Sequence, residues 1–435
     1  MMPPFAIHHI DLQRPLPALG TDATTNGVYV VFWAHGIPLG HCLIPSGVLP
    51  MSPTMLRTYA YEAIAPAVAH YQADAPEGIH STDASPLDAV QQALAARTLH
   101  YTAAEASVVV CTRDRPESLA RCLDTLAMLS PAPAEIIVVD NAPQTDATRL
   151  LVEARPDVRY VHEPRPGLDI ARNTGVRASR GRIIAFTDDD VQVDPQWLYH
   201  LCAGFDTPDV MAVTGLVLPA ALDTEPQHRF ETHWGFHRGY LPRRFDADYT
   251  RAHLPYGVPA WEIGAGASMA FRRDAFAQVG GFDERLDVGA AGCSGDSEFW
   301  YRLLAHGWTC HYTPTAVAHH THRATARGLQ SQLHAYMRGH TAALLVQYER
   351  HGHRGLLRRL LVSLPLYYVR RLVRGMPAGY RGRYRTLFAE IRGALSGVLF
   401  YLRNRNAPSE TASDIAMEST SHKSPAAIES PVQTA

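Results

Sequence analysis

The apolar and polar positions in the first hundred residues predict a small module of strands and helices. Residues 27–45 contain two short apolar runs around a His-Gly pair, which is typical of two strands joined by a tight turn. Residues 54–71 and 88–97 have the apolar spacing of helices. We therefore expect an α+β module over residues 1–102.

From residue 103 the pattern changes to strands that alternate with helices. Continuous apolar runs are typical of strands buried on both faces, and the segments between them have helical spacing. This alternation predicts an α/β fold with a parallel, doubly wound sheet, which we expect to occupy residues 103–323. The runs at 107–111, 135–140, 158–162 and 182–190 predict the strands, and the segments at 116–129 and 168–179 predict helices.

Three further segments differ in character. Residues 221–259 are rich in His, Trp, Tyr and Arg and show little periodicity, which predicts a long ordered excursion rather than a core element. Residues 324–405 are mainly helical in pattern, with Pro365 and Pro377 as expected breaks. The Ser-, Thr-, Pro- and Ala-rich residues 406–435 predict a disordered tail.

Composition narrows the class of protein. The chain has 435 residues, of which 46% are hydrophobic and 19% charged, and this excludes a fibrous or wholly disordered protein. Six cysteines are scattered without a Cys-x-x-Cys pair, which favours the reducing cytoplasm. The N-terminal residues lack the charged and apolar regions of a secretory signal, and no apolar run approaches the roughly 20 residues of a membrane-spanning helix.

The charge is strongly segregated along the chain. Residues 351–405 carry twelve arginines and one acidic residue, Glu390, so their formal charge is +11 and the rest of the chain carries −13. Arginine alternates there with Leu, Val, Phe and Tyr. Residues 354–405 therefore either lie on an anionic membrane surface or pack on the main domain with their arginines in water. No nucleic-acid recognition motif accompanies the charge, so we expect no nucleic-acid partner.

Polar residues follow three of the predicted strands at the points where they end. In a doubly wound sheet these ends meet in one crevice, where ligands bind. Three adjacent carboxylates repel one another, which favours a Mg²⁺ or Mn²⁺ ion with phosphate oxygens completing its shell. The alternative is a solvated acidic turn that caps the following helix. The residues are Thr112, Arg113 and Asp114, then Asp140, then Asp188, Asp189 and Asp190.

Residues beyond the acidic cluster offer further chemistry. Asp296 precedes an amphipathic helix, where a carboxylate serves either as a general base or as a helix cap, and Glu298 is the second candidate base. Gly264 and Gly266 allow close backbone approach to a ligand, or simply form a tight turn. His320 and His322 share one face of a predicted strand, so either is a candidate metal ligand. The alternative is chance placement among 23 histidines.

Several ordered motifs together resemble the family 2 glycosyltransferases, which have a GT-A fold. The resemblance spans Ser107 to His322, and one position departs from it: members commonly carry Glu-Asp where this chain has Gly295-Asp296, which puts the acceptor contacts in doubt. The motifs are VVVCTRDRPESLARCLDTL, IIVVDNAP, GLDIARNTGVRASRGRIIAFTDDD, GAGASMAFRR and GGFDE followed by GDSEFWYRLL.

The resemblance implies a Rossmann-like sheet that binds a nucleotide-sugar donor. It also implies an inverting transfer to a hydroxyl. We expect a glycan or lipid-linked acceptor, as in polysaccharide biosynthesis, and a cytoplasmic protein that rests on the inner face of a membrane. Arg172, one turn from Asp169, contacts a phosphate or forms a structural ion pair. The implied roles place Thr112, Arg113 and Asp114 near the base, Asp140 on the base or ribose, Asp188 to Asp190 on a metal at the diphosphate, and Asp296 as general base.

Two other functions compete with sugar transfer. A sugar nucleotidyltransferase would require a Gly-rich phosphate loop that contains lysine, and Lys423 is the only lysine in the chain. A non-catalytic nucleotide-binding scaffold, whose C-terminal helices recruit partners, would bind nucleotide without transferring sugar.

Overall fold

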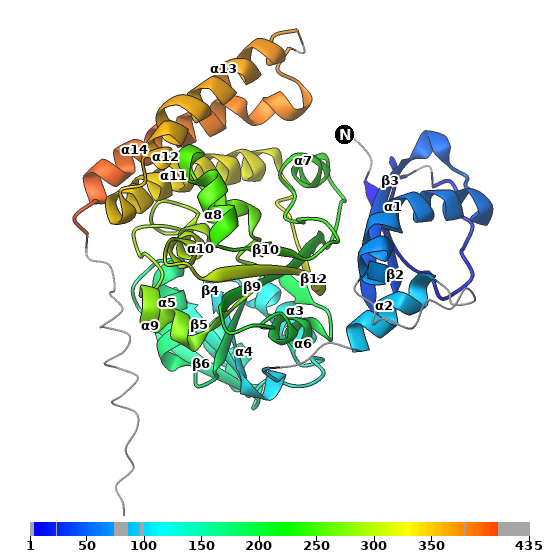
Figure 1. Ribbon diagram of the computed structural model, residues 1–435, viewed down its shortest axis with the longest axis horizontal. Coiled ribbons are helices and arrows are strands. Elements are labelled where there is room, and N and C mark those ends of the chain that lie inside the picture. Colours follow the sequence, from blue (N-terminus) through cyan, green and yellow to red (C-terminus); the bar gives the residue numbers. More distant parts are fainter. Residues whose placement is uncertain (1–3, 23, 74–85, 96–99, 378, 408–435) are drawn as a thin grey trace, which may run out of the picture.

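The computed structural model describes residues 4–22, 24–73, 86–95, 100–377 and 379–407. In Figure 1 a small N-terminal unit lies beside a larger unit built on a central sheet, and the C-terminal helices lie across one end of that larger unit. Most of the predicted disordered tail falls outside the described residues. None of the helices within the described ranges combines the length and the apolar character needed to cross a membrane.

The N-terminal unit is a three-stranded sheet with two helices. The predicted turn is present: His35 and Gly36 have positive φ angles of 51° and 78° and join the second strand to the third. The first strand pairs parallel to the second and was not predicted, because the apolar residues of its FAIHHID sequence do not alternate with polar ones. The elements are β1 (Phe5–Asp11), β2 (Gly27–Ala34), β3 (Ile37–Pro45), α1 (Pro53–Ala73) and α2 (Pro86–Ala95).

This unit packs directly on the edge of the larger one. The Phe5 N–H donates to the Leu222 carbonyl oxygen at 3.0 Å. The Tyr240 hydroxyl lies 3.0 Å from Nδ1 of His41. The rings of His9 and His319 meet edge to face with centroids 5.4 Å apart. The N-terminal unit therefore supports the larger one from one side, while the predicted boundary at residue 102 stays a prediction.

The central sheet has nine strands and is parallel in one half. Strands β4 to β7 form the predicted doubly wound part, in which β4 pairs parallel with both β5 and β7. The other half is mixed, because β11 runs antiparallel to both of its neighbours. The order is β10-β12-β9-β11-β7-β4-β5-β6, with β8 paired to β12. The strands are β4 (Ala106–Thr112), β5 (Glu135–Asn141), β6 (Val158–Glu163), β7 (Ile183–Asp188), β8 (Val191–Val193), β9 (Val210–Pro219), β10 (Arg243–Phe245), β11 (Met269–Arg272) and β12 (Thr309–His320).

Alternate residues of the strands enter two hydrophobic cores. Val109 and its register partner Ile137 belong to one core, whereas Val108 and Val110 belong to the other. Because both faces are covered by helices, the middle positions of β4, β5 and β7 form continuous apolar runs, as the sequence pattern indicated. The covering helices are α3 (Pro116–Leu126), α4 (Ala147–Glu153), α5 (Leu168–Ala178), α6 (Trp197–Ala203), α9 (Arg273–Val279) and α10 (Gly295–Ala305).

Residues 221–259 are more regular than predicted. They contain α7 (Glu225–Trp234), β10 and α8 (Ala247–His253). The first of these helices begins with a capping box between Thr224 and Gln227, which the sequence analysis did not use. Phe245 is fully buried in the main core, so the prediction that this region contributes no core element was wrong.

The C-terminal helices form a layer above the sheet. The long helix α11 packs closely along α14, where a side chain at Gly397 would overlap the Thr341 hydroxyl. Pro365 does not break the chain as predicted: it lies in the first turn of α13, where no N–H is required, after a π-helical turn at Arg359–Ser363. The helices are α11 (Ala326–His351), α12 (Arg354–Arg358), α13 (Leu364–Gly375) and α14 (Leu387–Asn404).

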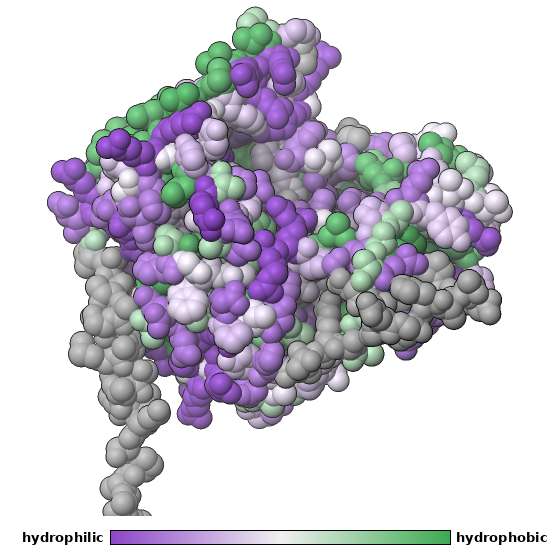
Figure 2. Space-filling model, viewed as in Figure 1, coloured by the Kyte–Doolittle hydropathy of each residue, from purple (hydrophilic) through white to green (hydrophobic). Residues whose placement is uncertain are grey.

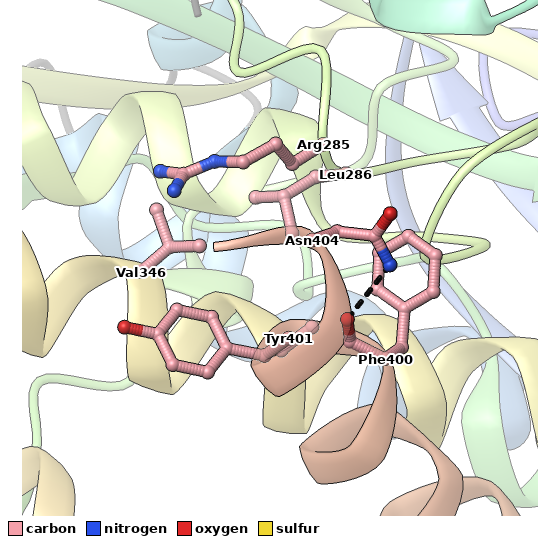
Figure 3. A pocket seen from close by; sticks show the side chains of 7 residues that line it. Arg285, Leu286, Val346, Phe400, Tyr401 and Asn404 are labelled. Atoms are coloured by element: carbon pink, nitrogen blue, oxygen red, sulfur yellow. Dashed lines mark hydrogen bonds between the residues drawn. The ribbon is translucent and has the colours of Figure 1, made fainter. Parts of the chain in front are cut away.

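The end of α14 is closed against α11 and the loop at residues 285–286. Figure 3 shows the small cavity between them, lined by Leu286, Val346 and Phe400, with the Asn404 amide donating to the Phe400 carbonyl oxygen at 2.8 Å. Its volume of about 10 Å³ holds no more than one water molecule. This contact fixes the helical layer to the larger unit and is not a ligand site.

Candidate active site

One large cavity lies where the carboxyl ends of the parallel strands meet the helical layer. Its volume is about 1280 Å³, which is sufficient for a nucleotide sugar together with part of a second substrate. The strand side contributes residues from the ends of β4 and β7. The opposite side is formed by α11 and α13, which contribute Tyr336 and Tyr367.

The acidic cluster at the end of β7 is held by residues that follow β4. Because β4 and β7 are paired, Thr112 comes close enough for its hydroxyl to donate to Asp189 Oδ2 at 2.7 Å. Arg115 donates to Asp189 Oδ1 at 2.6 Å and to Asp190 Oδ2 at 2.8 Å. Arg115 was not singled out in the sequence, although it belongs to the first quoted motif.

Burial and charge separate the three carboxylates. Burial raises the pKa of Asp188 to about 7 and that of Asp189 to about 6. Burial also raises the pKa of Asp190, but the neighbouring His320 and Arg115 outweigh it, so this pKa lies below its usual value. Asp190 therefore keeps its negative charge most firmly, and the cluster is not the solvated turn considered as the alternative.

His320 faces Asp190 across the edge of the cavity. The short strand β8 pairs with the end of β12, and this pairing places His320 Nε2 3.4 Å from Asp190 Oδ1. Burial lowers the pKa of His320 to about 4, so the imidazole is neutral at pH 7. His322 does not line the cavity. Its Nδ1 lies 3.0 Å behind His320 Nδ1.

Asp296 enters the cavity from the first turn of α10. Ser294 occupies the N-cap position of this helix, so Asp296 is not its N-cap. The Ser297 N–H donates to Asp296 Oδ1 at 2.6 Å. Burial, and then the charge of Asp287, raise the pKa of Asp296 above its usual value, which suits a residue that accepts a proton.

Gly264 and Gly266, the two glycines of the predicted turn, both line the cavity, and neither has room for a side chain. A Cβ on Gly266 would lie 2.9 Å from the Arg172 guanidinium and 3.0 Å from Asp296 Oδ2. A Cβ on Gly264 would lie 2.5 Å from Thr214. The absence of a side chain at position 266 therefore brings the backbone against the candidate base.

Arg172 forms the structural ion pair that was one of its two predicted roles. Its Nη1 donates to Asp169 Oδ1 at 2.9 Å and to Asp287 Oδ2 at 2.7 Å, while the side chain also lines the cavity. A side chain at Gly295 would overlap the Asp169 carboxylate, which explains why glycine stands at this position. Asp287 has a positive φ of 59° in a glycine-rich loop and was not predicted.

Besides His322, three predicted residues lie outside the cavity lining. Asp114 accepts a hydrogen bond from the Gln144 N–H at 2.8 Å, and Asp140 accepts one from the Tyr160 hydroxyl at 3.0 Å. Asp114 follows β4 and Asp140 lies near the end of β5, beside the lining residues Arg113 and Asn141. Glu298 is fully buried and paired with Arg302 at 2.9 Å, so it is not placed to act as the base.

Comparisons with known proteins place this arrangement in a family. The profile described as "Glycosyl transferase family 2" matches residues 107–280. A succinoglycan biosynthesis protein, ExoM of Rhizobium meliloti, is 32% identical over 231 residues, which cover 51% of this chain and 67% of that protein. The chain belongs to glycosyltransferase family 2. The predicted family and GT-A fold are thereby confirmed.

Other relatives of this family 2 glycosyltransferase match it over part of their length. A pre-mycofactocin glycosyltransferase of Mycobacterium tuberculosis is 28% identical over 247 residues, or 56% of this chain and 48% of that protein. The chain thus spans about half the length of that relative. A solved mannosyltransferase from Pyrobaculum calidifontis, in complex with GDP-Man and Mn²⁺, shares the fold with a TM-score of 0.50 and 19% identity, over 72% of this chain and 90% of that one.

The donor atoms around Asp190 in this glycosyltransferase fit a divalent cation. Within the described ranges, no group of three or more His, Cys, Asp or Glu side chains is arranged to hold a metal ion. Asp190 and His320 nevertheless offer a carboxylate oxygen and a neutral imidazole nitrogen to the same space, and Asp188 lines the cavity beside them. A site of this kind takes its remaining ligands from a bound diphosphate.

Proposed function

We propose that this glycosyltransferase moves a sugar, with inversion and with the help of Mg²⁺ or Mn²⁺, from a nucleoside-diphosphate donor to a hydroxyl of a glycan or lipid-linked acceptor. One observation carries the proposal: the carboxylates at the end of β7 and Asp296 from α10 line the same cavity. The two groups required for activating a leaving diphosphate and an attacking hydroxyl are therefore in one place.

Asp190 and His320 would hold the cation, and Asp188 would lie beside the donor. The Pyrobaculum mannosyltransferase with the same fold is in complex with GDP-Man and Mn²⁺, which supports this class of donor. The cation, when bound, stabilises the charge that develops on the diphosphate oxygen as the bond to the sugar breaks. Arg115 balances the acidic cluster from the β4 side, and Arg113 lines the cavity near the expected position of the base.

Asp296 would act on the acceptor. Its carboxylate takes the proton of the acceptor hydroxyl, the oxygen bonds to the anomeric carbon, and the nucleoside diphosphate leaves from the opposite face. A raised pKa, produced by burial and Asp287, makes the Asp296 carboxylate a stronger proton acceptor. A single base without an enzymic nucleophile corresponds to inversion of the anomeric centre.

Donor turnover tests the proposal directly. Incubation with UDP- and GDP-sugars and Mn²⁺ should release nucleoside diphosphate, and Asp296→Asn should lower transfer by about 10²–10⁴-fold. The variant should still bind Mn²⁺ and nucleotide, because Asp296 is not a predicted ligand. A non-catalytic scaffold would instead bind nucleotide and release none. If sugar transfer is unchanged in Asp296→Asn, then Asp296 is not the general base.

We also propose that the acceptor is presented at an anionic membrane surface, on its cytoplasmic side, by the C-terminal helices. The six cysteines are free thiols, as expected of a reducing compartment. Figure 2 shows apolar residues along the outer edge of the C-terminal helices. The apolar residues exposed by half or more are Leu361, Val362, Val369, Val373 and Met376 around α13, and Phe388, Leu395, Leu399 and Leu402 on α14.

Charge favours a lipid surface over a second copy of the chain. Nine arginines of this region are exposed, so two such faces would repel one another, whereas anionic headgroups would pair with them. The same helix α13 contributes Leu364 and Tyr367 to the cavity. A membrane in contact with the outer face of α13 would therefore lie next to the active site, where a lipid-linked acceptor enters.

Vesicle flotation distinguishes a lipid surface from a second copy of the chain as the partner of this apolar face. The full chain should float with phosphatidylglycerol vesicles, float weakly with phosphatidylcholine vesicles, and lose binding in high salt. Val369→Ser with Val373→Ser should reduce flotation at least several-fold, whereas Met128→Ser, at an exposed apolar position on the larger unit, should not. A dimer that dissociates in the double variant, together with no flotation of the parent chain, would assign the face to a second copy.

A further inference from the structure

A buried chain of hydrogen bonds runs behind the proposed metal ligand His320. Nδ1 of His320 lies 3.0 Å from Nδ1 of His322, and Nε2 of His322 lies 3.0 Å from Glu231 Oε2. Glu231 comes from α7, and His322 follows the end of β12. All three residues are buried, with 3–8% of their surface exposed.

The distances along this chain favour one order of donors and acceptors. The Glu231 carboxylate only accepts, so Nε2 of His322 carries a proton. In the order that agrees with the long contact between His320 Nε2 and Asp190 Oδ1, Nδ1 of His322 accepts from Nδ1 of His320. The ring of His322 lies beside those of Phe230 and Phe236, at centroid distances of 4.6 and 5.8 Å, so packing as well as hydrogen bonding holds its plane.

The consequence falls on the nitrogen that faces the cavity. With its proton on Nδ1, His320 presents a bare Nε2 to Asp190 Oδ1. Their separation of 3.4 Å exceeds the roughly 2.7–3.2 Å of an N–H···O hydrogen bond, as expected for two acceptors that face each other. A single cation between His320 Nε2 and Asp190 Oδ1 would accept a lone pair from each of them.

We propose that Glu231 and His322 are positioning residues that hold His320 in the tautomer required for binding a divalent cation through Nε2. The inference rests on the proposed function, in which Asp190 and His320 hold that cation. It adds a role for two residues that touch neither the cation nor the sugar. Partners of this kind commonly change metal affinity by about 10–100-fold.

The N-terminal unit completes the burial of this chain. The ring of His237 lies between Glu231 and the N-terminal sheet: its Nε2 is 3.9 Å from Glu231 Oε1, and its face meets the edge of His41 with centroids 5.1 Å apart. The His41 ring comes from β3. The small unit therefore shields Glu231 from water, which strengthens the hydrogen bond that sets the proton order.

Two substitutions at one position separate tautomer control from packing. His322→Phe fills the same aromatic site but accepts no hydrogen bond, so Mn²⁺ should bind about 10–100-fold more weakly. His322→Asn places an amide oxygen near the position of Nδ1 and should keep the affinity within a few-fold of the parent chain. Free Mn²⁺, titrated alone and counted by electron paramagnetic resonance, measures both without any turnover.

The tautomer itself can be observed in the metal-free protein. Long-range ¹H–¹⁵N spectra of ¹⁵N-histidine-labelled chain, with His320→Gln to identify the signal, should show the His320 proton on Nδ1 in the parent chain and in His322→Asn. The proton should move to Nε2 or exchange between nitrogens in His322→Phe. A parent chain protonated on Nε2, or equal Mn²⁺ affinity in all three proteins, would overturn the inference. If the parent chain shows the Nδ1 proton but binds no Mn²⁺, the metal part of the proposed function fails while the tautomer control stands.

Discussion

The two walls of the active-site cavity are built in different ways. On the strand side, charged groups are held by short hydrogen bonds, as between Arg115 and Asp190 or between Arg172 and Asp287. On the helical side, α11 and α13 contribute mainly aromatic and aliphatic side chains, such as Tyr336, Tyr367 and Leu364, and the outer face of α13 is exposed and apolar.

The two walls are therefore suited to different steps, the strand side to the reaction and the helical side to acceptor binding. Charge that develops in a reaction is stabilised best by groups that are already oriented and buried, which describes the strand side. Amphipathic aromatic residues beside an exposed apolar surface suit an acceptor with a lipid portion, which describes the helical side. We therefore expect substitutions on the strand side to stop chemistry and substitutions on the helical side to change acceptor affinity.

The largest effect is expected from Asp190→Asn on the strand side. The substitution removes the charge that faces His320 but leaves an oxygen for Arg115, so the fold should persist. Sugar transfer should fall by about 10²–10³-fold, and Mn²⁺ should no longer raise the melting temperature in the presence of nucleotide. Asp194→Asn, which changes an aspartate outside the cavity lining, is the matched control. Transfer that falls equally in both variants would show that the strand wall has no special role.

A smaller effect is expected from Tyr367→Ala on the helical side. Tyr367 lines the cavity, is 38% exposed and receives a hydrogen bond from Arg383 at 3.2 Å. The KM for octyl and dodecyl glycoside acceptors should rise about tenfold, which corresponds to roughly 1.4 kcal/mol of lost contact. Donor hydrolysis without acceptor should not change.

The control is Tyr61→Ala, which removes an exposed tyrosine from the N-terminal unit. A loss of donor hydrolysis in Tyr367→Ala would contradict the division between the walls, because it would place this residue in the chemical step.

The strand side was the part that the sequence could predict. Apolar runs that end in polar residues identify parallel strands, and parallel strands bring their ends together whatever the loops between them do. Asp188, Asp190 and Thr112 therefore came to one place as expected. Asp287 could not be found in this way, because its position depends on a glycine-rich loop with no periodic pattern.

The helical side depends on long-range packing that local patterns do not contain. Nothing in the sequence of α11 indicates that Tyr336 faces the strand ends, and the antiparallel insertion of β11 was hidden in a short apolar run. Glu231 was missed for a related reason. Its helix begins with a capping box inside a region whose overall composition predicts irregular structure.

Acidification should lower stability through a group behind the strand wall, outside the cavity lining. Burial lowers the pKa of His41 to about 4, the neighbouring His237 lowers it further, and the charge of Glu231 opposes both. Tyr240 and Tyr29 complete its surroundings. Above pH 6.5 the ring is neutral in the folded and the unfolded chain, so His41 contributes no pH dependence there.

Below that pH the unfolded chain takes up a proton that folded His41 refuses until about pH 4, so stability is lost across this window. At pH 5 the loss from this residue is about 2 kcal/mol. His41→Gln should therefore show a smaller fall in melting temperature between pH 7.5 and pH 5 than the parent chain, while His100→Gln, at an exposed position, should match the parent. Equal falls in all three proteins would show that the contact between the N-terminal unit and the strand wall does not depend on a neutral His41.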